Sequence, residues 1–145
     1  MKQRMDFYAA DAGVYQAMVG LEKQVEKSGI EKSLAELVRM RASQINGCAY
    51  CLDMHAADAR QGGENVRRLD TLSAWRETPF FTDRERAALA WTESLTLVAE
   101  TRVPDEVWEQ VRVHFSEAEL ANLTLLVVAI NGWNRFAVSF RKMPE

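Results

Sequence analysis

Four residues with reactive side chains stand in the order E-x11-C-x2-C-x3-H: Glu36, Cys48, Cys51 and His55. The two cysteines are the only ones in the chain. If residues 48–55 are helical, the helix repeat places both thiols and the imidazole within about a 60° sector of one face. Two thiols beside a base can form and break a disulfide with proton transfer, or can bind a metal ion. The spacing therefore indicates a chemical site.

The residues before Cys48 favour a reactive thiol pair. A cysteine reacts as its thiolate, and only about 3% of an ordinary thiol is ionised at pH 7. Asn46 and Gly47 are typical of a helix end, so Cys48 and Cys51 are predicted in the first turn of the next helix, where free N–H groups stabilise an anion. A cap position would also let Cys48 approach Cys51, because regular i,i+3 Cβ atoms lie about 5–6 Å apart and a disulfide needs about 3.5–4.5 Å.

The role of Glu36 has two interpretations from the sequence. If the helices before and after Asn46 and Gly47 pack as a hairpin, Glu36 faces His55 and the pair can move protons. Alternatively, Glu36 is the last member of a capping box that begins at Ser33. The spacing alone leaves both open.

Zinc binding is the main chemical alternative, since C-x-x-C supplies two ligands of a tetrahedral site and His55 a third. A second cysteine pair is missing, and His114 is the only other histidine. Buried, unreactive cysteines are a further alternative.

Large aromatic residues are expected mostly in the core or in subunit contacts, with a substrate pocket as the alternative: Trp75, Trp91, Trp108, Trp133, Phe80 and Phe81. Asn131, Asn134 and Arg135 surround Trp133 near a helix junction, where capping and surface pairing is their expected role and a part in the functional site is the alternative.

The chain is predicted to fold as a single all-α domain over residues 1–145. No stretch alternates between apolar and polar residues, and three capping boxes announce helix starts, at Ser33 with Glu36, Thr82 with Glu85, and Ser116 with Glu119. Breaks are expected at Gly29, Asn46–Gly47, Gly62–Gly63, Pro79 and Pro104. The helices are predicted near residues 9–28, 33–45, 48–61, 64–76, 83–99, 104–114, 117–130 and 132–141.

Charge and hydropathy exclude several classes of partner. The 18 basic and 21 acidic residues are interspersed, with a net charge of −3, so nucleic acid is not an expected partner. The longest apolar run, residues 123–130, is far shorter than the roughly 20 residues of a membrane span. The N-terminal residues do not resemble a secretory signal. We therefore expect a cytoplasmic protein whose cysteines are thiols at rest.

The four-residue motif resembles the signature of the alkylhydroperoxidase D-like (AhpD-like) proteins in the carboxymuconolactone decarboxylase superfamily. Further stretches are similar to the peroxidase-related branch of that superfamily: QINGCAYCLDMH, LSAWRE, FTDRERAALAWTESLT and INGWNRFAVSFR. Together they cover most of the chain from about residue 30. The resemblance implies a bundle of about seven to eight helices, with C-x-x-C at the start of a central helix, and a homotrimer or a hexamer of dimers.

The resemblance also implies a thiol peroxidase that needs no cofactor and acts on hydrogen peroxide or organic hydroperoxides. If the roles of the matching residues in that family apply here, Cys51 attacks the peroxide and becomes a sulfenic acid, and Cys48 then forms a disulfide with it. His55 and Glu36 relay protons. The implied reductant is a dithiol, either lipoyl-bearing or thioredoxin-like.

Two features set this chain apart from relatives. Tyr50 stands where some relatives have a second relay histidine, which implies a changed proton path and lower activity. Relatives without the cysteine pair are cofactor-free lactone decarboxylases, so Cys48 and Cys51 argue against that reaction. The alternatives are a redox-sensing or disulfide-exchange module with little turnover, and a zinc-binding structural protein.

Overall fold

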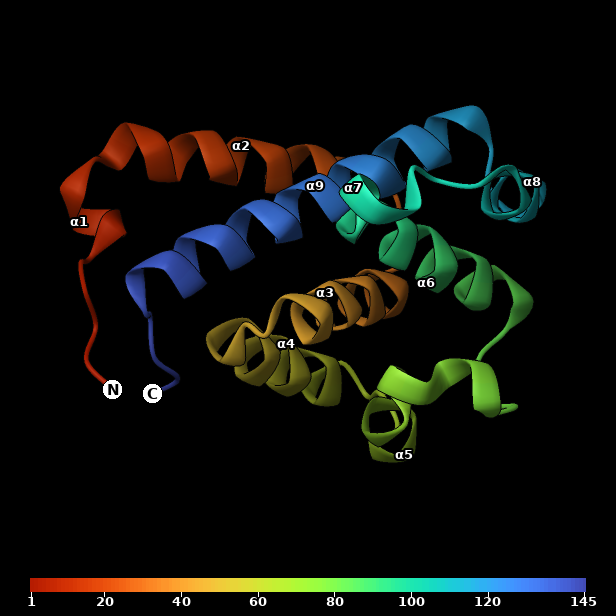
Figure 1. The fold of residues 1–145 in the computed structure, drawn as a ribbon, viewed down its shortest axis with the longest axis horizontal. Coiled ribbons are helices and arrows are strands. Elements are labelled where there is room, and N and C mark those ends of the chain that lie inside the picture. Colours follow the sequence, from red (N-terminus) through yellow and green to blue (C-terminus); the bar gives the residue numbers. More distant parts are fainter.

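The computed structural model describes residues 1–145, and it contains helices and no strands (Figure 1). The all-α prediction is confirmed. The helices are α1 (Phe7–Ala10), α2 (Ala12–Lys27), α3 (Lys32–Asn46), α4 (Ala49–Gln61), α5 (Val66–Asp70), the 3₁₀ helix η1 (Leu72–Glu77), α6 (Asp83–Thr96), α7 (Val98–Thr101), α8 (Asp105–His114) and α9 (Glu117–Phe140).

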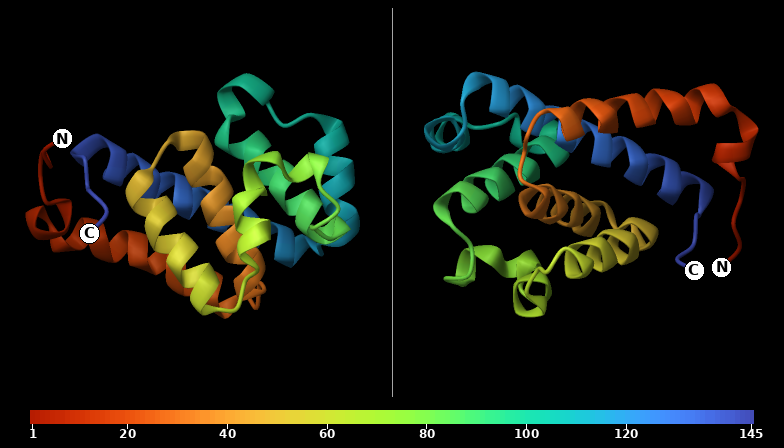
Figure 2. Two further views of the ribbon diagram at one scale, coloured as in Figure 1. Left: turned by 90° about the horizontal axis from the view of Figure 1, so that it is seen from below. Right: turned by 180° about the vertical axis from the view of Figure 1, so that it is seen from behind.

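Helix α3 lies at the centre and packs against α4, α6 and α9 (Figures 1 and 2). Helices α2 and α9 run side by side along one side of α3, and α6 carries α8 at the end far from the termini. The two chain ends lie close together, since the backbone N–H of Arg4 donates to the carbonyl of Phe140 (2.9 Å). This arrangement brings the start of the chain beside the α3–α4 hairpin that carries the motif.

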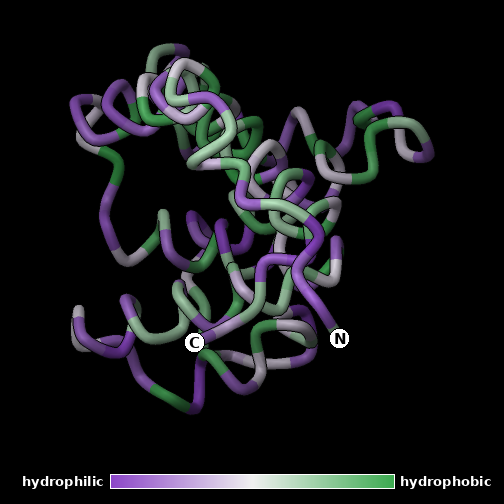
Figure 3. The backbone as a smooth tube through the Cα atoms, turned by 90° about the vertical axis from the view of Figure 1, so that its left-hand side faces the viewer, coloured by the Kyte–Doolittle hydropathy of each residue, from purple (hydrophilic) through white to green (hydrophobic).

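The core forms where the apolar faces of these helices meet. Figure 3 shows hydrophobic and hydrophilic segments alternating along the helices, as expected for amphipathic helices. One cluster joins α3, α6, α8 and α9, and it includes Val38, Val111 and Leu123, none of which is exposed. A second lies under α4, α5 and η1 around Leu37 and Leu72. Burial of this kind, at about 25 cal/mol per Å² of apolar surface, stabilises the bundle.

Helix α9 corrects the predicted break between residues 130 and 132. Its 24 residues run without interruption, because Asn131 keeps its side chain inside the fold, donating to the carbonyl of Val127 (2.9 Å) and to Thr96 Oγ1 (3.1 Å). Gly132 is a point of close approach: a Cβ there would lie 2.8 Å from the Met18 methyl group of α2. The asparagine and glycine seat α2 against α9 and do not end the helix.

The continuous α9 also changes the hydropathy argument. Its most apolar 18-residue window has a mean hydropathy of 1.3, so by length and composition alone this helix could cross a membrane. Core helices of soluble proteins pass the same test, and 39% of this window is buried inside the fold.

Other boundaries differ from prediction where a local cap intervenes. Asp11 caps α2 through Gly13 N–H and so divides the predicted 9–28 helix. The predicted 64–76 helix is α5 followed by η1, and the predicted 83–99 helix ends at Thr96. The capping boxes at Thr82 and Ser116 are confirmed.

The box predicted at Ser33 is wrong. Helix α3 begins after Glu31, without a side-chain cap, and the expected capping carboxylate of Glu36 is used elsewhere.

Candidate active site

The cysteines lie at the turn between α3 and α4, as the sequence predicted. Gly47 ends α3 in the left-handed conformation (φ 67°), which costs glycine little. Cys48 is the extended N-cap of α4, and its sulfur accepts a hydrogen bond from the Cys51 N–H (3.3 Å). The two cysteines form a disulfide with Cα atoms 5.4 Å apart. The cap position thus lets an i,i+3 pair join.

The disulfide is enclosed by apolar side chains. Cys48 and Cys51 are 1% and 2% exposed, and they cluster with Ala42 of α3 and with Ile130 and Ala137 of α9. Reaction at either sulfur therefore depends on the cavities that reach it.

Glu36 and His55 meet across the α3–α4 hairpin. Glu36 Oε2 lies 2.9 Å from His55 Nδ1, and His55 is buried. Because an ionised carboxylate only accepts hydrogen bonds, Nδ1 carries the proton and Nε2 is the basic nitrogen. Burial raises the pKa of the Glu36 carboxyl, but hydrogen bonds and charges from His55 and Arg39 outweigh burial and hold the pKa below its usual value. Glu36 is therefore ionised at neutral pH.

Arg39 extends this pair into a longer chain of polar contacts. Its guanidinium donates from Nη1 to Glu36 Oε1 (2.6 Å) and from Nη2 to Glu22 Oε2 (2.9 Å) on α2. Glu22 Oε1 in turn accepts from Trp133 Nε1 (3.1 Å) on α9. Side chains from four helices, α2, α3, α4 and α9, thus form the chain of contacts around the Glu36 carboxylate.

A cavity of about 290 Å³ opens onto Cys51 and His55. Its polar lining also includes Glu22, Glu36, Arg39 and Asp58. The remainder is mainly aromatic and aliphatic: Phe7, Tyr8, Tyr15, Val19, Tyr50, Met54, Trp133 and Ala137. Cys48 does not line this cavity. The fold therefore brings three of the four motif residues, Cys51, His55 and Glu36, into one cavity, which we call the Cys51 chamber.

Cys48 faces a second cavity, of about 300 Å³, formed by the two chain ends. Gly47 and Tyr50 line it from the α3–α4 turn, while Met1, Arg141 and Lys142 line it from the termini. The two cysteines of the disulfide therefore line different cavities.

Tyr50 separates the two cavities and lines both. The Lys142 ammonium lies 4.7 Å from the centre of the Tyr50 ring and 4.9 Å from that of Tyr8. Burial, followed by the charge and hydrogen bond of Tyr50, raises the pKa of Tyr8. Tyr8 therefore stays protonated at neutral pH.

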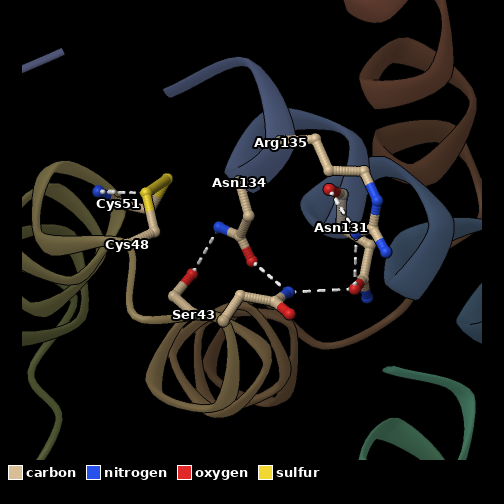
Figure 4. The surroundings of a disulfide bond; sticks show 7 residues. Ser43, Cys48, Cys51, Asn131, Asn134 and Arg135 are labelled. Carbon is tan, nitrogen blue, oxygen red and sulfur yellow. Dashed lines mark hydrogen bonds between the residues drawn. A yellow bond between two sulfur atoms is a disulfide. The ribbon is translucent and has the colours of Figure 1, made fainter. Parts of the chain in front are cut away.

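A partly buried network of polar side chains joins α3 to α9 behind the disulfide (Figure 4). Asn134 of α9 donates to Ser43 Oγ (2.9 Å), and Asn46 Nδ2 donates to Asn134 Oδ1 (2.9 Å) and Asn131 Oδ1 (3.0 Å). Arg135 Nη1 donates to Asn131 Oδ1 (3.1 Å). Capping and surface pairing near a helix junction was the role predicted for Asn131, Asn134 and Arg135. They instead join α3 to the middle of α9.

The groups named for zinc are arranged differently from the sequence-based alternative. The two cysteines are joined to each other, and His114 lies on α8 at the far end of the molecule (Figure 1). Glu36, His55 and Asp58 can each offer a ligand atom within 4.8 Å of the others. The Glu36 carboxylate, however, is already held by Arg39.

Sequence reasoning missed most of the cavity wall. Six aromatic residues were considered for a pocket, and of these Trp133 lines this one. Trp75, Trp91 and Phe81 are core residues, Phe80 packs against the core, and Trp108 is exposed. Arg39 had a signal, because it follows Glu36 by one helical turn. Glu22, Tyr8 and Tyr15 come from the N-terminal helices, which no motif connects to the cysteines.

The chain is similar to several known proteins. The pattern of the Carboxymuconolactone decarboxylase family matches residues 12–94. The chain is 40% identical to the uncharacterised protein YdfG of Bacillus subtilis over 96% of this chain and 95% of that protein. A protein of unknown function from Agrobacterium tumefaciens, provisionally assigned to antioxidant defence as AhpD, is 41% identical, with a TM-score of 0.96 and 99% of both chains covered. An uncharacterised peroxidase-related protein from Silicibacter sp. TM1040 is 24% identical, with a TM-score of 0.83 over 95% of this chain and 73% of that one, and shares the fold.

Proposed function

The chain belongs to the carboxymuconolactone decarboxylase family, and from that premise we propose that it is a thiol peroxidase working through the Cys48–Cys51 pair. The single observation that carries the proposal is the chamber that brings Cys51 together with the Glu36–His55 pair, while Cys48 stands within bonding reach. The relative provisionally assigned to antioxidant defence supports the same reading.

The proposed cycle starts from the reduced pair. The Cys51 thiolate attacks the outer oxygen of a hydroperoxide, the O–O bond breaks, and Cys51 becomes a sulfenic acid while the alkoxide takes up a proton and leaves as the alcohol. The Cys48 thiol then attacks the Cys51 sulfur, releasing water and forming the disulfide. An external dithiol reduces that disulfide by thiol exchange and becomes a disulfide itself. The sum is one hydroperoxide and one dithiol converted to alcohol, water and disulfide.

His55 and Glu36 supply the proton transfers of this cycle. With Nδ1 held by Glu36, the Nε2 atom of His55 accepts the proton of the Cys51 thiol and returns it to the leaving oxygen. The glutamate stabilises the imidazolium that forms in between, as a carboxylate does beside a catalytic histidine. The α4 N-terminus adds further stabilisation to the thiolate.

We assign the two cysteines different roles because they line different cavities. Cys51 lines the chamber with the base, which supports it as the attacking thiol. Cys48 lines the cavity at the chain ends, which supports it as the sulfur that the reductant reaches. We propose a lipoyl-bearing or thioredoxin-like dithiol as that reductant, in the cytosol.

A homo-oligomer is part of the proposal. It rests on the family resemblance, and the half-exposed side chains of Val98 and Val128, at 52% and 53%, are candidates for the contact. Light scattering in solution tests whether the assembly is a homotrimer or a hexamer.

The decisive experiment is a thiol titration with intact mass measurement, on reduced protein before and after one equivalent of cumene hydroperoxide. We expect two thiols to become none, with a loss of two hydrogens. After the same treatment Cys48→Ser should hold a sulfenic acid that dimedone traps, and Cys51→Ser should keep its thiol.

Turnover separates this function from redox sensing. We expect steady consumption of hydroperoxide when dihydrolipoamide is supplied, and both serine variants should abolish it. Disulfide formation without turnover would favour a redox-sensing or disulfide-exchange module, and turnover in both serine variants would reject the dithiol cycle.

A further inference from the structure

We infer that the Cys51 chamber selects neutral, apolar organic hydroperoxides and rejects those that carry a carboxylate. This inference rests on the proposed peroxidase function and names its substrate class. It follows from the shape, the lining and the charges of the cavity.

The size and wall of the chamber favour a large apolar group. A water molecule occupies about 30 Å³ of liquid, so a cavity of about 290 Å³ is much larger than hydrogen peroxide needs. Nine of its 14 lining residues are hydrophobic. Tyr8 packs edge-on against Tyr15 (ring centres 4.9 Å apart), and the Trp133 ring lies 6.0 Å from Tyr15. Such rings bind flat or branched hydrocarbon groups.

The charged residues at the chamber disfavour an anion. Three carboxylates line it, those of Glu22, Glu36 and Asp58, against one guanidinium, that of Arg39. Both Nη atoms of Arg39 are already paired with Glu22 and Glu36, and its Nε atom, which has no partner, is buried, so Arg39 does not offer its fork to a substrate carboxylate. Asp58 is exposed and forms no ion pair. With His55 neutral, the lining carries two negative charges in excess.

The ammonium group of Lys142 does not reverse this balance. Lys142 contacts the rings of Tyr8 and Tyr50, and its side chain lines the Cys48 cavity and not the Cys51 chamber. A substrate carboxylate in the chamber therefore meets like charges in a partly desolvated space, where repulsion is screened less than in water.

The test measures binding to the oxidised protein, where no turnover is needed. The probes are 2-phenylpropan-2-ol, the alcohol formed from cumene hydroperoxide, its 4-carboxylate, and the methyl ester of that acid. By calorimetry we expect the alcohol and the ester to bind with similar affinity and the carboxylate at least about 10-fold more weakly, which corresponds to about 1.4 kcal/mol. The difference should shrink as salt is raised.

A matched pair of variants assigns the effect to the chamber. Asp58→Asn removes a carboxylate that lines the chamber, and Asp53→Asn removes one from the exposed face of the same helix, outside the chamber. We expect the first to bring the carboxylate probe closer to the ester by about 3-fold or more, and the second to leave the ratio unchanged.

Two results would overturn the inference: equal binding of carboxylate and ester, or no binding of the ester at all. Neither depends on peroxide chemistry. A protein that fails the thiol titration but ranks the probes as expected refutes only the peroxidase cycle, and the reverse outcome refutes only the selectivity.

Discussion

The Glu36 carboxylate turns away from Ser33, one helical turn before it, and lies instead 2.9 Å from Nδ1 of His55 on the next helix. This single contact decides between the two roles that the sequence allowed for Glu36. It also fixes which nitrogen of His55 is basic, because a carboxylate at Nδ1 leaves the lone pair on Nε2.

Replacing Glu36 with glutamine should slow the formation of the disulfide by peroxide by at least about 100-fold, because the amide neither fixes the tautomer of His55 nor stabilises its imidazolium. Stopped-flow measurement of the reduced protein with cumene hydroperoxide checks this. Glu100→Gln, an exposed change on α7, is the control and should leave the rate unchanged. A Glu36→Gln rate equal to wild type would remove the glutamate from the relay.

Acid should unfold the protein partly through Glu93. This carboxylate accepts hydrogen bonds from Arg76, Trp75 and Arg41, at 2.5, 2.9 and 2.8 Å. Burial raises its pKa, but these hydrogen bonds outweigh burial and lower the pKa from the ordinary 4.5. Because the folded pKa is the lower one, the stabilisation is complete above about pH 4.5 and is lost as the pH falls through the folded value.

Urea unfolding at pH 7, 5, 4 and 3 tests this sign. We expect the free energy of unfolding to fall below pH 5. We expect Glu93→Gln to be about 1–3 kcal/mol less stable at pH 7, and to lose less of its unfolding free energy between pH 5 and pH 3 than wild type does. If Glu93→Gln lost as much unfolding free energy as wild type over this pH range, the assignment to Glu93 would be contradicted.

Gly47→Ala should destabilise the protein by about 1–2 kcal/mol, because alanine pays for the left-handed backbone that glycine adopts freely. A Cβ at this position meets no other atom, so the cost is conformational alone. Gly20→Ala is the matched control: it is helical, equally uncrowded, and should stabilise by up to about 1 kcal/mol. Chemical unfolding measures both, and a neutral Gly47→Ala would refute the strained turn.

Asn134→Ala should cost about 1–3 kcal/mol of unfolding free energy, since it leaves the Ser43 hydroxyl without its buried partner. Because Asn134 also holds Asn46 beside the turn, we expect disulfide formation to slow as well. Ser139→Ala, exposed on the same helix, serves as the control for both measurements. A variant as stable as wild type would mean that the network does not support the turn.

The sequence predicted the parts of this molecule that depend on local chemistry. The helix starts at Thr82 and Ser116 follow from side chains that bond to their own first turn, and the cap at Cys48 follows from the Asn46–Gly47 pair before it. The same local rule was wrong at Ser33, because a buried histidine offered Glu36 a better partner. Local signals fail where a tertiary contact competes with them.

The wall of the chamber was beyond sequence reasoning for a related physical reason. Tyr8 and Tyr15 reach Trp133 only because α2 packs along α9, and that pairing depends on the space at Gly132, which the sequence presented as a break. Contacts between residues more than a hundred positions apart produce no periodic pattern in the sequence from which they could be predicted.

The meeting of the two chain ends has a practical meaning for anyone who handles the protein. Met1 and Pro144 both border the recess at Cys48, and Arg4 is tied to Phe140. A purification tag at either end would therefore lie beside the recess by which the proposed reductant reaches Cys48. Disulfide reduction rates measured on tagged protein would then reflect the tag as well as the fold, so protein with the tag removed is the proper starting material.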